Sequence, residues 1–276
     1  MKNVTIILSL LFCFQAFAQR KPKIKGNKNV IGVQEDLPPF NGIELNDDLK
    51  IQLVKGRQEG LFITADDNLI DVLKFEVVDD VLQIGSFYKI AGKKKLEIIV
   101  NYAHLNSVVV HDGRIESKDN LVTDVFDAKL YGSGKLEMNV NASTINLEME
   151  GNSSGDLNFQ SDSLNIILKD RIDVKVYAKT SEWTKVQLFT NANIKLEGTA
   201  YAMSAKLYDN SNFRASKYKA EGVQIFAEGS PSARVFASTD FELNSKGSSK
   251  TYLSGNPKIE IIEFLDTSEL HKQKSK

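Results

Sequence analysis

The feature that most restricts the fold of this chain is a repeat of 19 or 20 residues through its C-terminal two thirds. One column of the repeat is apolar at seven of eight positions: Val110, Leu130, Met149, Leu168, Leu188, Leu207, Phe226 and Ser245. Two residues further on, the matching column is Asp112, Gly132, Gly151, Asp170, Thr190, Asp209, Glu228 and Gly247. An inward aliphatic residue followed by Gly, Asn or Asp indicates a strand that ends in a corner, because these residues tolerate a left-handed backbone.

The repeat predicts an all-β fold, a β-solenoid of about eight coils in which each coil buries its apolar side against the next. The alternative is a β-sandwich with evenly spaced strands. Turns in a sandwich recur roughly every 8–12 residues and give no fixed column over so many repeats. The constant spacing therefore favours the solenoid.

The chain begins with the pattern of an export signal. Residues 1–18 combine a short charged start, an apolar stretch and an Ala16-Phe17-Ala18 cleavage site, as in a secretory signal peptide. The single cysteine, Cys13, lies in this segment, so the mature chain has no thiol for disulfides or metal binding. Residues 19–36 show little periodicity and are predicted to form a flexible leader.

Three further segments follow the leader. Residues 37–105 alternate apolar and polar positions and are predicted to form an N-terminal β region that caps the solenoid, with a hairpin at Asp79-Asp80 and a short helix over 68–73. The solenoid is expected over 106–264, with a closing strand at 259–264. Residues 265–276 are expected to be a polar tail.

The charge balance and the histidine content exclude several classes of function. The chain has 35 Lys and Arg against 36 Asp and Glu, intermixed along the sequence, which does not predict a nucleic-acid-binding protein. Its three histidines have no ligand spacing, so no metal site and no cofactor are expected. No apolar run after the signal peptide is long enough to span a membrane.

Outward aromatic side chains are the candidate binding residues. Tyr131, Phe189 and Tyr208 occupy one column directly before the corner, beside Asn191 and Asn210 in the corner itself. Exposed rings of this kind bind sugars or proteins, whereas rings that stack on one another merely stiffen the sheet. A sixth candidate, Trp183, lies in a connecting stretch that is expected to bulge from its coil.

The sequence resembles a known family through short pieces whose order and spacing match. These pieces are Phe40-Asn41-Gly42-Ile43, Val54-Lys55-Gly56, Ala65-Asp66-Asp67-Asn68-Leu69, Val78-Asp79-Asp80-Val81-Leu82-Gln83-Ile84 and Tyr131-Gly132-Ser133-Gly134. Over about residues 39–262 the chain is similar to the putative auto-transporter adhesin, head GIN domain family. Asp80 departs from the family pattern, where a glycine is more usual. The resemblance implies a β-helical fold and export, and it carries no catalytic residues.

We therefore expect an exported, non-enzymatic binding or adhesion module in the periplasm or on the cell surface, with a glycan or an envelope protein as its partner. Two alternatives remain open. One is a polysaccharide lyase or hydrolase that uses Asp170 and Asp209, two coils apart. The other is a structural envelope protein that self-associates into a homo-oligomer through exposed sheet edges.

Overall fold

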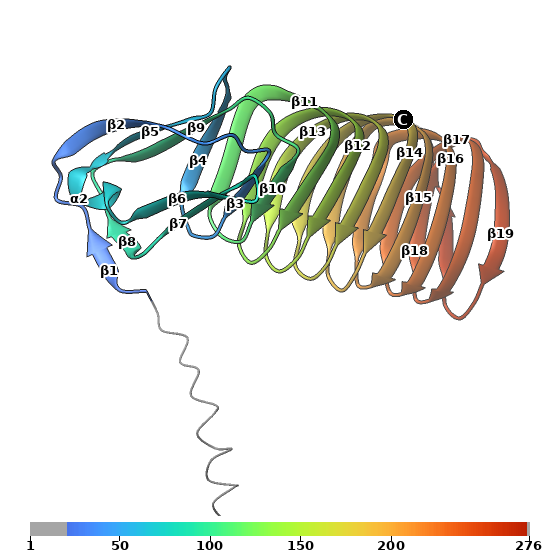
Figure 1. Ribbon diagram of the computed structural model, residues 1–276. Coiled ribbons are helices and arrows are strands. Elements are labelled where there is room, and N and C mark those ends of the chain that lie inside the picture. Colours follow the sequence, from blue (N-terminus) through green and yellow to red (C-terminus); the bar gives the residue numbers. More distant parts are fainter. Residues whose placement is uncertain (1–20, 275–276) are drawn as a thin grey trace, which may run out of the picture.

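The repeated strands stack in parallel, so that equivalent residues of successive coils lie directly over one another (Figure 1). The structure is a computed structural model that describes residues 21–274. It confirms the all-β class and the β-solenoid, which makes about nine turns. The predicted signal peptide lies outside the described residues.

Seven long strands form the body of the solenoid. They are β11 (Arg114–Leu130), β12 (Lys135–Met149), β13 (Ser154–Leu168), β14 (Asp173–Leu188), β15 (Asn193–Asp209), β16 (Asn212–Gly229) and β17 (Ser232–Gly247). Each strand arches over partway along its length and returns, so that one strand supplies both sides of a coil (Figure 1). In β13 the alternation of buried residues shifts between Ser161 and Leu164, which keeps the apolar side chains inward around the arch.

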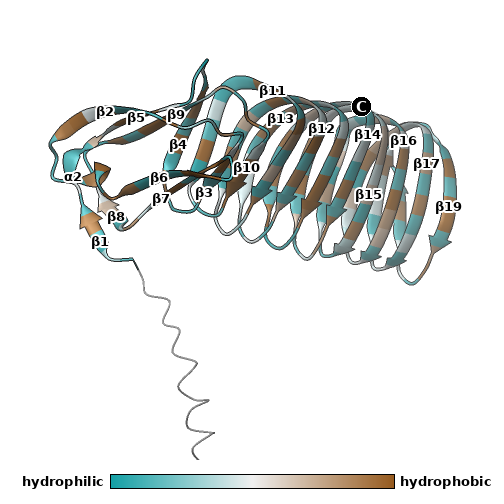
Figure 2. Cartoon of the chain, in the orientation of Figure 1, coloured by the Kyte–Doolittle hydropathy of each residue, from teal (hydrophilic) through white to brown (hydrophobic). Residues whose placement is uncertain are grey.

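The arch divides the solenoid into two lateral surfaces. We call the residues before the arch the first face and those after it the second face. In β14 these are residues 173–180 and 183–188. Figure 2 shows apolar and polar residues alternating along the strands, in agreement with one side chain in two pointing into the core.

The corner turns between the long strands explain the Gly and Asp column. Positive φ occurs at Gly113, Gly132, Gly151, Asp170, Thr190, Asp209, Gly229, Gly247 and Asp266. Six of the eight predicted corner residues are therefore correct, and Asp112 and Glu228 each precede the true position by one residue. The aspartates stand where glycine is otherwise found because a short polar side chain tolerates this conformation.

One member of the predicted inward column is wrong. Leu207 pairs with Ala227, not with Phe226, which lies on the outside next to Lys206. The reason is a register shift between Lys195 and Glu197, where β16 carries an extra residue. The displacement is confined to β16, because Ala227 pairs with Ser245 on β17 and Ser245 is again a member of the predicted column.

Thr190 is the one β-branched residue among the corner positions, with a φ of +61°. We expect Thr190→Gly to raise the free energy of unfolding by about 0.5–1 kcal/mol, because relief of about 1–2 kcal/mol of strain exceeds the flexibility cost of glycine. Urea denaturation measures the change. The control Thr199→Gly, at an exposed strand position, should lose about 0.5–1 kcal/mol instead. A loss in both variants would contradict a strained turn.

The N-terminal β region is continuous with the first coil. Its elements are β3 (Gly42–Leu45), β4 (Lys50–Lys55), β5 (Gly60–Asp66), α2 (Asp67–Ile70), β6 (Leu73–Val78), β7 (Val81–Ser86), β8 (Lys89–Gly92), β9 (Leu96–Tyr102) and β10 (Ser107–Val110). Strand β3 pairs with β10, and β4 pairs with β11, so the cap extends the solenoid core. The β6–β7 hairpin turns at Asp79 and Asp80, both at positive φ. The helix expected over 68–73 is present as α2, but it ends at Ile70 and is shorter than expected.

The predicted flexible leader is wrong for the described residues. They form β1 (Lys23–Lys25), which pairs with β8, and β2 (Val30–Asp36), which pairs antiparallel with β5. Most side chains of β2 are exposed, so the strand carries no alternating apolar pattern. Backbone hydrogen bonds to β5 and β8 hold this segment in place. Such bonds do not depend on side-chain type, so the amino-acid sequence contained no sign of these strands.

Asp66 ties the same segment to the cap. Its carboxylate accepts hydrogen bonds from the backbone N–H groups of Lys28, Lys94 and Lys95. Burial raises the pKa of Asp66, but the three N–H donors outweigh it and the net pKa lies below the usual value. The ionised form of Asp66 therefore helps to hold β1 and β2 in place.

The C-terminal end of the solenoid remains open among the described residues. The last strands are β18 (Lys250–Ser254), β19 (Lys258–Phe264) and β20 (Glu269–Lys272). Strand β19 pairs with β17, as expected of a closing strand, but Ile261 is 49% exposed because no further coil covers it. Part of the predicted polar tail is also strand, since β20 pairs with β18.

Candidate functional site

The aromatic column before the corner is built as a ladder of stacked side chains. The rings of Phe189 and Tyr208 lie 5.0 Å apart and within 6° of parallel. Tyr131 stacks on His111 at 5.3 Å, and Phe226 packs against Tyr208 at 5.7 Å. Because the rings of the two stacked pairs face one another, they present edges to solvent, which favours a stiffening role over a flat sugar platform.

Charged rungs interrupt the ladder and separate Tyr131 from the other two rings. Glu150 and Lys169 fill the column between them, and Lys169 lies 2.9 Å from Glu148. The hydrogen bond to Glu148 raises the pKa of Lys169, so this rung stays cationic. The six predicted binding residues do not form one site.

Asn191 and Asn210 lie in the corner turns beside Phe189 and Tyr208, and both side chains are exposed. The backbone N–H of Asn210 donates to the carbonyl oxygen of Thr190, one coil below. These four residues follow one edge of the solenoid. Trp183 lies near the arch, at the opposite edge.

Asp170 and Asp209, the two carboxylates considered for catalysis, stabilise the corner turns. Asp170 accepts a hydrogen bond from the backbone N–H of Gly151, and Asp209 accepts one from Thr190. Both have positive φ. Within residues 21–274, no three His, Cys, Asp or Glu side chains cluster as a metal site requires.

Trp183 borders a groove on the second face, which we call the Trp183 groove. Its volume is about 260 Å³, and it runs across successive coils. The lining residues are Trp183, Ala202, Met203, Gly222, Val223, Gln224, Asp240, Phe241, Glu242, Lys258 and Glu260. Trp183 is 43% exposed, so much of the indole is free to contact a ligand.

The groove exists because the residues stacked beyond Trp183 are small. Trp183 pairs with Ala202, Ala202 with Gly222, and Gly222 with Asp240. A Cβ atom added at Gly222 would meet nothing within 4 Å. An aromatic side chain therefore stands beside a shallow floor of Ala and Gly.

Hydrogen-bonding groups line the far side of the groove. Gln224 Nε2 on β16 donates to Glu242 Oε2 on β17 at 3.4 Å, and Glu260 follows on β19. Asp240 follows Gly222 in the column that contains Trp183. An apolar ring opposite amide and carboxylate groups suits a ligand with both a hydrophobic face and hydroxyl donors. From the sequence we predicted Trp183 as a binding residue but not the other residues of the groove. Ala202 and Gly222 nevertheless follow Trp183 at the repeat spacing of 19 and 20 residues.

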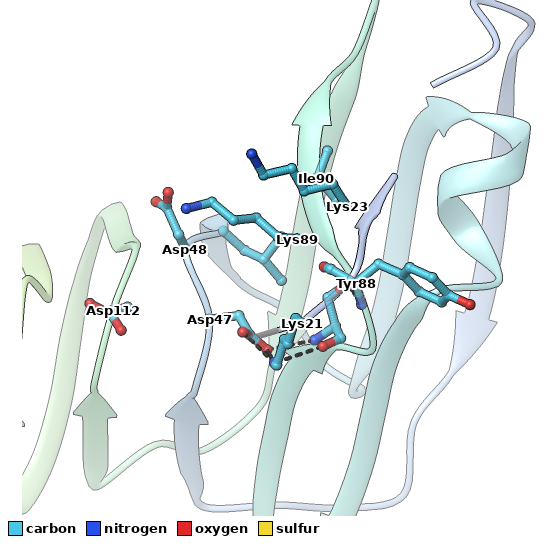
Figure 3. Close-up of a pocket in the computed structure, with 10 residues that line it drawn as sticks. Lys21, Lys23, Asp47, Asp48, Tyr88, Lys89, Ile90 and Asp112 are labelled. Carbon is cyan, nitrogen blue, oxygen red and sulfur yellow. Dashed lines mark hydrogen bonds and ion pairs between the residues drawn. The ribbon is translucent and has the colours of Figure 1, made fainter. Parts of the chain in front are cut away.

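A larger hollow of about 500 Å³ lies between the cap and the first coil (Figure 3). Lys21 Nζ is 2.6 Å from Asp47 Oδ2 and 2.8 Å from the carbonyl oxygen of Ser86. Lys23 and Lys89 extend into the same space as Asp48 (Figure 3). The ion pair between Lys21 and Asp47 anchors the N-terminal segment to the cap. We therefore interpret this hollow as a structural junction.

Comparisons with known proteins agree with this architecture. Residues 39–166 and 152–257 match the family described as putative auto-transporter adhesin, head GIN domain. No curated protein matches the chain. Within residues 21–274, no helix has the length and apolar character needed to cross a bilayer.

Solved structures share the fold at low sequence identity. A putative adhesin from Parabacteroides merdae has a TM-score of 0.65 at 15% identity, covering 91% of this chain and 99% of its own. A putative adhesin from Parabacteroides distasonis has a TM-score of 0.69 at 15% identity, covering 90% and 99%. A putative lipid binding protein from the same species has a TM-score of 0.55 at 19% identity, covering 92% and 98%.

Proposed function

This protein belongs to the putative auto-transporter adhesin, head GIN domain family, and we propose that it is an exported, non-catalytic module of the bacterial cell envelope that binds a glycan in the Trp183 groove. Membership in a family of adhesin head domains supports a location outside the cytoplasm and a role in binding.

The observation that carries the proposal is the exposed indole beside a floor of small residues. Sugar rings present an apolar face of C–H groups and a rim of hydroxyls. Trp183 would take the apolar face, while Gln224, Asp240 and Glu242 would accept or donate hydrogen bonds at the rim. The rigid, stacked strands hold these groups in place before a ligand arrives, which lowers the entropic cost of binding.

The carboxylates of Asp170 and Asp209 do not support the alternative of a polysaccharide-cleaving enzyme. Both are engaged by backbone N–H groups at the corner edge, away from the Trp183 groove. A turn-stabilising role accounts for both residues.

Trp183→Ala is expected to weaken glycan retention by about thirtyfold, because loss of a central aromatic anchor typically costs about 2 kcal/mol. A panel of neutral and amino-sugar polysaccharides from bacterial envelopes and host surfaces, immobilised and probed with the mature chain, provides the measurement. The matched control is Tyr177→Ala, which removes an equally exposed ring on the first face. Equal retention by both variants would overturn the groove as the site, and release of reducing ends or unsaturated products would overturn the non-catalytic role.

A further inference from the structure

A row of four cations crosses the first face in register. Lys175 pairs with Lys195, Lys195 with Arg214, and Arg214 with Arg234 on consecutive strands. All four side chains are exposed, and neighbouring strands place them roughly 4.8 Å apart along the solenoid axis. We call these four residues the basic row.

A row of this kind works against stability, since like charges directly opposite one another on adjacent strands repel. The earlier rungs of the same column show how such a cost is normally offset. There the column carries Glu116 and Glu137, and the adjacent column supplies Arg114, 3.2 Å from Glu116, and Lys135, 3.2 Å from Glu137.

The basic row has less of this compensation. In the adjacent column the residues beside Lys195, Arg214 and Arg234 are Asn193, Asn212 and Ser232, which are uncharged. Three acids lie near the row. Asp156 precedes Lys175 in the same column, on β13. Glu197 is 2.8 Å from Lys195, and Asp173, itself 81% exposed, is 3.9 Å from Arg214.

Further cations surround the row. Between the turns and the arch of β14–β17, the first face carries Lys175, Lys179, Lys195, Arg214, Lys217, Lys219 and Arg234, against the acids Asp173 and Glu197. Seven positive charges against two negative charges leave this half of the face strongly basic, although the whole chain is nearly neutral.

We propose that the basic row binds a linear acidic polysaccharide whose carboxylates follow the solenoid axis. The row is straight and its charges recur at the strand spacing, which is close to the length of one sugar in an extended chain. Proteins that bind single-stranded nucleic acid place several aromatic rings between the cations, and the bases stack on these rings. In this column one ring lies next to the row: Tyr252 follows Arg234 on the next strand, and the Arg234 guanidinium lies over it. This inference does not depend on the Trp183 groove, which lies on the second face.

The double variant Lys175→Gln, Arg214→Gln tests the proposal, with polygalacturonate as the probe. Each cation near an anionic surface contributes about a fivefold gain in affinity, so the pair is expected to lose on the order of 30-fold. Binding by the unaltered chain should also weaken steeply as salt rises. The matched control is Lys185→Gln, Lys206→Gln, which removes two exposed cations from the second face and should bind polygalacturonate as the unaltered chain does.

Three results would overturn the proposal: equal losses in both double variants, tighter binding of an oligothymidylate than of polygalacturonate, and binding of neutral dextran at the same affinity. The melting temperature separates binding from folding, because neutralising part of a repelling row should leave it unchanged or higher. Trp183→Ala should retain polygalacturonate fully, so failure of the groove proposal and failure of the basic row give different results.

Discussion

Phe213→Ala is expected to lower the free energy of unfolding by about 3–5 kcal/mol, the range typical for a fully buried Phe. Phe213 has no exposed surface and stacks between Ile194 on one coil and Ala233 on the next. Because Ala233 is small, Phe213 fills much of the space at this level of the core. The backbone ladders on both sides prevent the coils from collapsing into the cavity.

The loss should also be local. A coil contacts only its neighbours, so stability along a solenoid is a sum of adjacent contributions. Hydrogen exchange should therefore accelerate in β15, β16 and β17 and stay slow in β5 and β9 of the cap. The control Lys206→Ala, at an exposed position, should change stability by less than about 0.5 kcal/mol. A uniform increase in exchange over the whole chain would contradict independent coils.

The sequence predicted the architecture well because the solenoid imposes its geometry on single residues. A corner that needs a left-handed backbone selects Gly or Asp, and a coil interior selects aliphatic side chains, at every turn. Asp170 and Asp209 could thus be placed in corners from spacing alone. The error at Phe226 arose where a bulge added one residue, which a fixed period of 19 or 20 cannot register.

The N-terminal segment and the binding surfaces were harder to predict for different reasons. Strand β2 is exposed on most positions and held by backbone pairing with β5, so its residues carry no periodic signal. The basic row did have a signal, because Lys175, Lys195, Arg214 and Arg234 recur at intervals of 20, 19 and 20. Counting charge over the whole chain concealed it, whereas counting charge by column would have found it.

The same register that builds the core therefore also assembles the surfaces. Each outward column becomes a line of like or complementary side chains: a ring ladder at the corner edge, a groove beside Trp183, and the basic row on the first face. On such a face, lines of side chains along the solenoid axis provide the contacts that can select a ligand. Ligands that are themselves linear and repetitive match this geometry best.

Gly198→Ala is expected to lower the free energy of unfolding by about 3–5 kcal/mol, from backbone strain of about 1–3 kcal/mol and steric crowding of similar size. Gly198 has a φ of +123°, and a Cβ atom there would lie 1.9 Å from the carbonyl oxygen of Ala178 on β14. That oxygen belongs to the ladder between β14 and β15, so the added methyl group must push the two coils apart.

The disruption should reach the polar cluster inside these coils. Gly198 pairs with Tyr218, whose buried hydroxyl lies 2.6 Å from Thr184 Oγ1 and 3.0 Å from Thr180 Oγ1. Burial raises the pKa of Tyr218, the two threonine hydrogen bonds oppose that rise, and the net pKa stays above its usual value. Separating β14 from β15 admits water, so the tyrosine should ionise at lower pH in an absorbance titration.

Gly222→Ala is the matched control, because it makes the same chemical change where an added Cβ meets nothing within 4 Å and φ is not positive. It should leave stability unchanged or raise it by about 0.4–1 kcal/mol, through the reduced flexibility of the unfolded chain. Urea denaturation of the two variants separates the effects. Similar stability in both would mean that the close approach of Gly198 to Ala178 does not hold these coils together. A loss confined to Gly198→Ala would show that contact between the two backbones, rather than glycine content, sets the spacing of the coils.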